Sequence, residues 1–195
     1  MLLRPTYPVL TDRLALRPFT VEDVDAMLAY RGRADVCRYL PFEPQDRDTL
    51  LERLSGPVLS RSDLTAEGQA LTLGAWRRDT GELAGDVIVF LRSENDRGGE
   101  IGWVFDPDHG GRGFATEAAG AVLDLAFGEL GLHRVEARLD VLNVRSAALC
   151  ERLGMRREAH FVRNEWFKGA WSDLLVYGLL TEEWSGTAQD RSAPS

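Results

Sequence analysis

Cysteine and histidine are scarce in this sequence of 195 residues, and the few that occur are scattered. The two cysteines, Cys37 and Cys150, lie far apart in the chain and support neither a disulfide framework nor a thiolate metal site. The three histidines, His109, His133 and His160, lack the spacing of metal ligands. The sequence therefore predicts no metal site, and its cysteine usage is typical of a reducing cytosol.

Long apolar runs and an excess of positive charge are also missing. No stretch of about 18 apolar residues occurs, and the first ten residues lack the apolar segment of a secretory signal. We therefore expect a cytoplasmic protein without a membrane span. The net charge of -8 argues against a nucleic-acid binder, because such proteins present a basic face to phosphates. A cationic partner fits this charge better.

The hydrophobic pattern predicts one α+β domain over residues 1–184, and we expect the small, polar tail over 185–195 to be disordered. Alternation of polar and apolar residues predicts strands, whereas apolar residues at helical spacing predict helices. Strands are expected over 13–17, 70–75, 83–91, 100–105, 135–141, 156–166 and 173–180, and helices over 20–30, 48–54, 116–130 and 146–153. The order β-α-α-β-β-β-α-β-α-β-β predicts a mixed, mostly antiparallel sheet flanked by helices.

A glycine-rich turn, His109-Gly110-Gly111-Arg112-Gly113-Phe114-Ala115, lies between a predicted strand and the longest predicted helix. Glycines adopt conformations closed to other residues and leave backbone N–H groups uncovered. The start of a helix adds N–H groups without partners and the positive end of the helix dipole. The turn therefore predicts a phosphate or pyrophosphate site, although a flexible loop without a ligand has the same composition.

Two other phosphate-binding motifs compete for this turn. A P-loop requires Gly-x-x-x-x-Gly-Lys-Ser/Thr, and the single lysine of the chain, Lys168, is far from the turn. The run Gly111-x-Gly113-x-x-Thr116 imitates most of a dinucleotide fingerprint, and Glu136 stands 20 residues beyond Thr116. We expect a dinucleotide site to be the minor alternative, because the turn follows antiparallel strands and threonine replaces the third glycine.

The turn resembles the acetyl-CoA signature of the GNAT acetyltransferases, Gln/Arg-x-x-Gly-x-Gly/Ala, with Gly110, Gly113 and Ala115 at its defined places. Gly110 departs from the pattern, which usually has Gln or Arg there. Other segments are similar to the ribosomal-protein N-terminal (Rim-type) branch of that family: Thr11-Asp12-Arg13-Leu14-Ala15-Leu16-Arg17-Pro18, Glu100-Ile101-Gly102-Trp103-Val104, Phe114-Ala115-Thr116-Glu117-Ala118, Asn143-x-x-Ser146 and Leu153-Gly154-Met155. Together these segments cover roughly residues 11 to 182 and imply a single GNAT domain.

The resemblance implies acetyl-CoA as co-substrate, bound between two strands that diverge. Backbone groups at Val104 and Phe105 would bind the pantetheine arm as a neighbouring strand does. Asn143 would reach the pantetheine with its side-chain amide, although asparagine there also suits a helix N-cap. The pyrophosphate would be bound by the turn, whose residues are Gly110, Gly111, Arg112, Gly113, Phe114, Ala115 and Thr116.

Acetyl transfer to an amine requires a base for the amine and an acid for the departing thiolate. Glu165 is the first candidate for the base, because the Rim-type branch carries a glutamate at the matching place, and Glu100 is the second. Either could instead be an ordinary solvated carboxylate. Ser146 matches the Rim-type serine expected to act as the acid. Cys150 competes, since many other family members have a proton-donating tyrosine there, but buried cysteines more often serve as small hydrophobes.

These observations predict an enzyme that acetylates a protein N-terminus or a small amine by direct attack. The alternative is a non-catalytic domain that binds acyl-CoA as a sensor or assembly module. The missing tyrosine and the unusual Gly110 keep this alternative open. Dimers are common among relatives, so a homodimer is a further expectation.

Overall fold

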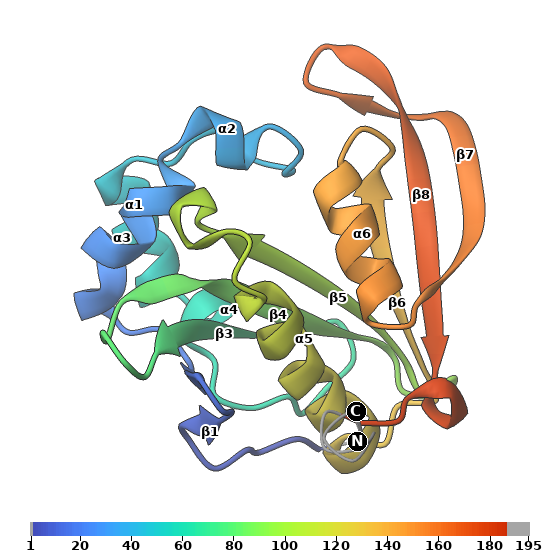
Figure 1. Ribbon diagram of the computed structural model, residues 1–195, viewed down its shortest axis with the longest axis horizontal. Helices are drawn as coiled ribbons and strands as arrows, with labels where there is room; N and C mark the ends of the chain where they lie inside the picture. The colour runs from blue at the N-terminus through green and yellow to red at the C-terminus, as the bar shows by residue number, and fades with distance from the viewer. Residues whose placement is uncertain (1, 187–195) are drawn as a thin grey trace.

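The computed structural model describes residues 2–186, which are built around an eight-stranded sheet (Figure 1). The strands are β1 (Val9–Leu10), β2 (Leu14–Arg17), β3 (Ala70–Arg77), β4 (Leu83–Ser93), β5 (Gly98–Phe105), β6 (Arg134–Asp140), β7 (Arg156–Phe167) and β8 (Ala170–Leu180), in the spatial order β1-β2-β3-β4-β5-β6-β8-β7. The helices are α1 (Val24–Arg31), α2 (Ala34–Cys37), α3 (Arg47–Ser55), α4 (Pro57–Ser60), α5 (Phe114–Asp124) and α6 (Val144–Arg152). Within 2–186, no helix is long and apolar enough to cross a membrane. Of the tail expected over 185–195, residues 187–195 lie outside the described part.

Two hydrophobic cores cover the two faces of the sheet. Helix α5 buries Phe114 and Val122 against one face, together with Ile101 of β5. Helices α1 and α3 bury Met27 and Leu50 in the other core, which includes Val104 of the same strand. Side chains three positions apart on a strand point to opposite faces, so Ile101 and Val104 assign the two cores to opposite sides. The sheet therefore forms the middle of three layers, and each face has its own helices.

The expected mixed sheet with flanking helices is confirmed, and the longer elements occur close to their predicted positions. Helix α5 begins at Phe114, two residues before the expected start at 116, because Gly113 already adopts a left-handed conformation as its N-cap. Strand β1 and helices α2 and α4 were not predicted. These elements have between two and four residues, too few for a hydrophobic period to be recognised.

Strands β5 and β6 are parallel, whereas every other strand pair of the sheet is antiparallel. The glycine-rich turn thus follows antiparallel strands, as the sequence indicated, and connects the parallel strands β5 and β6 through α5. The parallel pairing covers only Gly98 to Glu100 against Arg134 to Glu136. Beyond these residues the two strands diverge, as the resemblance implied.

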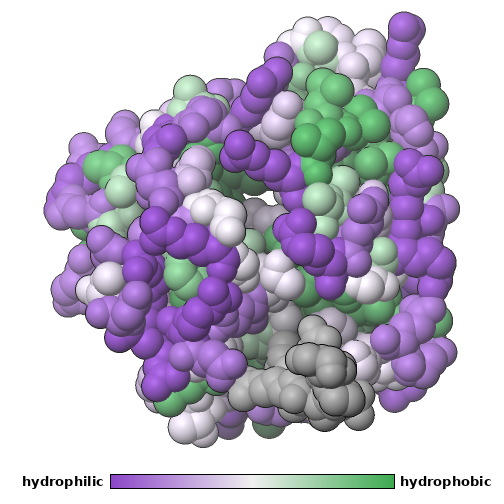
Figure 2. All heavy atoms as spheres, in the orientation of Figure 1, coloured by the Kyte–Doolittle hydropathy of each residue, from purple (hydrophilic) through white to green (hydrophobic). Residues whose placement is uncertain are grey.

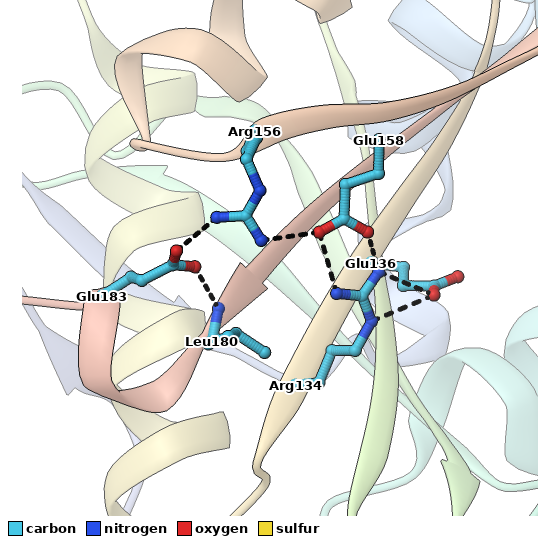
Figure 3. A network of polar contacts seen from close by, with 6 residues as sticks. All are labelled: Arg134, Glu136, Arg156, Glu158, Leu180 and Glu183. Atoms are coloured by element: carbon cyan, nitrogen blue, oxygen red, sulfur yellow. Dashed lines mark hydrogen bonds and ion pairs between the residues drawn. The ribbon is translucent and has the colours of Figure 1, made fainter.

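An ion-pair network holds β6, β7 and the end of β8 together (Figure 3). Arg134 of β6 binds Glu136 at 3.0 Å and also Glu158 of β7. Arg156 binds Glu158 at 2.8 Å and also Glu183, whose carboxylate accepts a hydrogen bond from the backbone N–H of Leu180. This network lies where β5 and β6 are still paired, so it fixes β6 at the point from which the strands diverge.

Candidate active site

The glycine-rich turn connects β5 to α5 and exposes its backbone. Gly111 and Gly113 have φ angles of 72° and 79°, a region that glycine enters without strain, and both are exposed. The first hydrogen bond of α5 runs from the N–H of Glu117 to the carbonyl of Gly113. The preceding N–H groups, including those of Phe114 and Ala115, consequently have no partner within the helix. Such a helix start fits the pyrophosphate of acetyl-CoA.

The close approach of the carbonyl of Pro107, three residues earlier in the same turn, explains why glycine occupies position 110. A β-carbon on Gly110 would lie 2.8 Å from the carbonyl oxygen of Pro107. The backbone folds tightly here because the side chain of Asp106 caps a short helical turn, Pro107–His109. A Gln or Arg at this position would require the turn to shift, so the departure from the family pattern is a local packing requirement.

Arg13 and Glu117 stabilise the backbone of the turn, and the sequence analysis assigned them no role. Arg13 donates from Nη1 to the carbonyl of Arg112 at 2.7 Å and from Nε to Glu117 at 2.7 Å. Glu117 also accepts hydrogen bonds from the backbone N–H of Arg13 and the hydroxyl of Thr11. Burial alone would raise the pKa of Glu117, but these hydrogen bonds hold it below its usual value. Glu117 therefore stays charged and paired with Arg13, and this pair fixes the backbone of the turn. Both residues lie in the motifs quoted for the resemblance, which is the signal that could have found them.

A side-chain hydrogen bond joins β5 to α6, the helix that follows β6. Trp103 of β5 donates from Nε1 to Oγ of Ser146 on α6, at 3.1 Å. The side chain of Asn143 accepts from the backbone N–H of Ser146 at 3.2 Å, which confirms the N-cap role. Val104 and Phe105 lie on β5 beyond the last residue that pairs with β6. In the orientation of Figure 2, the surface is hollowed between the α1 to α3 side and α6.

A cavity of about 270 Å³ lies beside β6 on the side of the sheet that faces α2. It is lined by Tyr39, Pro41, Arg92, Glu100, Arg138, Leu139, Asp140, Glu165, Phe167, Ser172, Asp173 and Leu174. Glu165 pairs in register with Ser172 near the tip of the β7–β8 hairpin, whereas Glu100 lies on β5. The fold thus brings together the two glutamates that the sequence offered as bases, although 65 positions separate them.

The two glutamates differ in their surroundings. Glu100 is bound by Arg92, whose Nε lies 3.0 Å from its carboxylate, and its side chain is 22% exposed. Glu165 is exposed, and its carboxylate has no hydrogen-bond or ion-pair partner among residues 2–186. Arg92 already occupies the carboxylate of Glu100, whereas the carboxylate of Glu165 is open to an incoming amine. The surroundings therefore favour Glu165 as a proton acceptor.

The outer wall of this cavity is held by the lysine at the tip of the β7–β8 hairpin. Lys168 donates from Nζ to the carbonyl oxygens of Cys37 and Phe42, at 2.8 and 3.0 Å. These two residues belong to α2 and the segment after it, which carries Tyr39 and Pro41 into the cavity wall. The hairpin and the α2 segment, far apart in sequence, are joined by these hydrogen bonds and lie near each other in Figure 1. Both contribute residues to the lining of the cavity.

Cys150 and Ser146 occupy different environments on α6. Cys150 has no exposed surface and lies in the core between α6 and the sheet. Burial raises the pKa of its thiol to about 12, so it remains protonated across the physiological range and is a poor proton donor. Ser146 is only partly buried and lies at the first turn of the helix, against Trp103. These differences favour Ser146 as the acid.

We expect Cys150 to resist alkylation by iodoacetamide at pH 8 in the folded protein and to react fully in urea, because burial keeps the thiol neutral and covered. Peptide mass spectrometry distinguishes Cys150 from Cys37. Turnover of Cys150→Ala should stay within about threefold of the unsubstituted protein, whereas Ser146→Ala should lose about 10-fold or more. A loss in Cys150→Ala as large as in Ser146→Ala would contradict this assignment.

Comparisons with known proteins agree with this geometry. The family model described as Acetyltransferase (GNAT) domain matches residues 13–156. The uncharacterized N-acetyltransferase YnaD of Bacillus subtilis (strain 168) is 33% identical over 185 residues, which cover 91% of this chain and 99% of YnaD. A GNAT-family acetyltransferase from Bacillus anthracis superposes with a TM-score of 0.78 at 27% identity, over 93% of this chain and 99% of that one.

A further solved structure is similar in fold. Spermidine N-acetyltransferase from Vibrio cholerae, in complex with CoA and spermine, gives a TM-score of 0.74 at 22% identity, over 89% of this chain and 98% of that one. The family match covers most of the chain, and the signature turn lies at the helix start where the family places it. The chain belongs to the GNAT family of acetyltransferases and is an acetyl-CoA-dependent N-acyltransferase.

Proposed function

We propose that this protein transfers the acetyl group of acetyl-CoA to a primary amine by direct attack of the amine. The observation that carries the proposal is the divergence of β5 and β6 after Glu100, with the exposed helix start on one side and the acidic cavity on the other. The thioester supplies the activated acetyl group, and the residues around the gap bind, orient and move protons.

The N–H groups from Gly111 to Thr116 bind the pyrophosphate, assisted by the positive end of the α5 dipole. The edge of β5 at Val104 and Phe105, which has no strand partner on the β6 side, binds the pantetheine amides. Asn143 uses its side-chain oxygen for the helix cap, so its amide nitrogen is left to bind the pantetheine.

Glu165 and Ser146, on opposite faces of the sheet, carry out the two proton transfers. Glu165 accepts the proton of the amine that enters from the cavity, where the carboxylate is exposed and unpaired. Ser146 donates to the departing thiolate from the α6 side, where Trp103 orients its hydroxyl oxygen. Both cysteines are fully buried, which supports direct attack rather than an acyl-cysteine on the enzyme.

Thiol release from acetyl-CoA in the presence of an amine panel tests the proposal. The panel should include spermidine, peptides with free N-termini, and amino acids. We expect amine-dependent thiol release and, by mass spectrometry, a product carrying one acetyl group. Tight CoA binding without acetylation of any panel member would instead support the sensor or assembly module.

A further inference from the structure

Most charged side chains around the cavity are already paired with groups of the protein. Arg92 and Glu100 bind each other. Asp140 accepts hydrogen bonds from the hydroxyl of Ser172 and the backbone N–H of Leu142. Asp173 is held by His160 at 2.7 Å and by the backbone N–H of Arg163. These groups stabilise the cavity wall and have limited capacity to bind a ligand.

Two charged side chains remain for a ligand. Glu165 and Arg138 both line the cavity, and within residues 2–186 neither has a hydrogen-bond or ion-pair partner. Their charges are opposite, and both side chains are exposed. Arg92, the other arginine of the lining, is already paired with Glu100.

The position of Arg138 connects it to the reaction site. Its strand, β6, pairs with β5 only as far as Glu136, two residues earlier. Side chains alternate along a strand, so Arg138 lies on the same face as Glu136 and opposite to the buried Leu139. Its cross-strand neighbour is the buried, apolar Val176, which offers the guanidinium no counter-ion. The fold therefore presents a guanidinium at the point where the gap between β5 and β6 opens.

We propose that Arg138 binds a carboxylate of the acceptor, so that the acceptor carries an amine and a carboxylate in one small molecule. This inference rests on the proposed acetyl transfer to an amine. Glu165 receives the proton of the amine, while the guanidinium binds the carboxylate through paired N–H donors. A cavity of about 270 Å³ lies at the small end of ligand sites, which suits an amino acid or a similar compound.

The strand register also sets the separation of the two groups. Arg138 pairs with Val176 and Glu165 with Ser172, so four residues of β8 and two strand spacings separate their Cα atoms. At about 3.3 Å per residue and about 4.8 Å per strand, this separation is roughly 16 Å. Both side chains line the cavity between these positions. The amine and the carboxylate of the acceptor are therefore several bonds apart, rather than attached to one carbon.

A matched series of probes tests this inference. The probes are straight-chain amino acids from glycine to 6-aminohexanoate, each compared with the n-alkylamine that has a methyl group in place of the carboxylate. We expect kcat/KM for at least one longer amino acid to exceed that of its alkylamine about 10-fold or more, as for a charge-assisted hydrogen bond. Glycine should show little preference.

Arg138→Gln should reduce this preference to less than about threefold by lowering kcat/KM for the amino acids, and the affinity for acetyl-CoA should not change. Arg157→Gln is the matched control, because Arg157 is also an exposed strand arginine but does not line the cavity. Alkylamines used as well as the amino acids would overturn the inference. A preference that survives in Arg138→Gln would do the same, and so would a loss of acetyl-CoA affinity in that variant.

Calorimetry separates this inference from the proposed function. Binding of the same probes to the CoA complex requires no acetyl transfer, so it reports on Arg138 even if no probe is acetylated. Tighter binding of a longer amino acid, lost in Arg138→Gln, supports the inference. Equal binding of the amino acids and the alkylamines, or equal binding by the two proteins, overturns it.

Discussion

Glu165→Gln should lower kcat by about 100-fold or more near neutral pH while leaving the affinity for acetyl-CoA unchanged, as expected for loss of a general base. The substitution keeps the shape of an exposed strand residue whose carboxylate has no partner among residues 2–186, so the fold should be preserved. Raising the pH should recover part of the rate, because more of the amine is then deprotonated without assistance. Steady-state kinetics with an acceptor identified in the panel, from pH 6 to 10, measure both effects.

Glu100→Gln is the matched control for this experiment. Glu100 lines the same cavity, but Arg92 occupies its carboxylate, so the variant should retain a larger share of the rate than Glu165→Gln. Its pH profile should keep the shape of the unsubstituted protein. If Glu100→Gln instead shows the large, pH-recoverable loss and Glu165→Gln does not, the assignment of the base is reversed.

Gly111→Asp should weaken binding of acetyl-CoA about 30-fold or more, because it places a negative charge among the N–H groups expected to bind the pyrophosphate. No atom lies within 4 Å of the position a β-carbon would take at Gly111, so the loop has room for the side chain. Asp tolerates a positive φ better than most residues, and the melting temperature should change little. Calorimetric titration with CoA measures the loss.

Gly111→Asn separates charge from shape. Asn has nearly the same size as Asp and tolerates the same backbone conformation, but it carries no charge. We expect it to weaken CoA binding by less than about fivefold, and the loss in Gly111→Asp should diminish as salt rises, because ions screen exposed charges. Equal affinities of both folded variants and the unsubstituted protein would show that the turn does not bind the pyrophosphate.

The glycine-rich turn, the proposed cofactor site, could be located from the sequence because the proposed function depends on local structure. Glycine conformations and a helix start act within a few residues, so one contiguous segment contains the whole signal. Gly110 illustrates the limit of this reading. The sequence marks it as a departure, but the reason, a 2.8 Å approach to the carbonyl of Pro107, becomes apparent only when the turn is folded.

The sequence alone determined the longer strands and helices, the family resemblance and the location of the glycine-rich turn, because these are encoded by hydrophobic period and short motifs. The tertiary structure decided which charges are free. Arg92 pairs with Glu100 across a hairpin, and Lys168 binds carbonyls more than a hundred positions away. Arg138 and Glu165 line one cavity and have no partners in the part of the chain that the structure describes. Such pairings depend on the order and register of strands, and Coulomb interactions act through space rather than along the chain. No local pattern could therefore predict them.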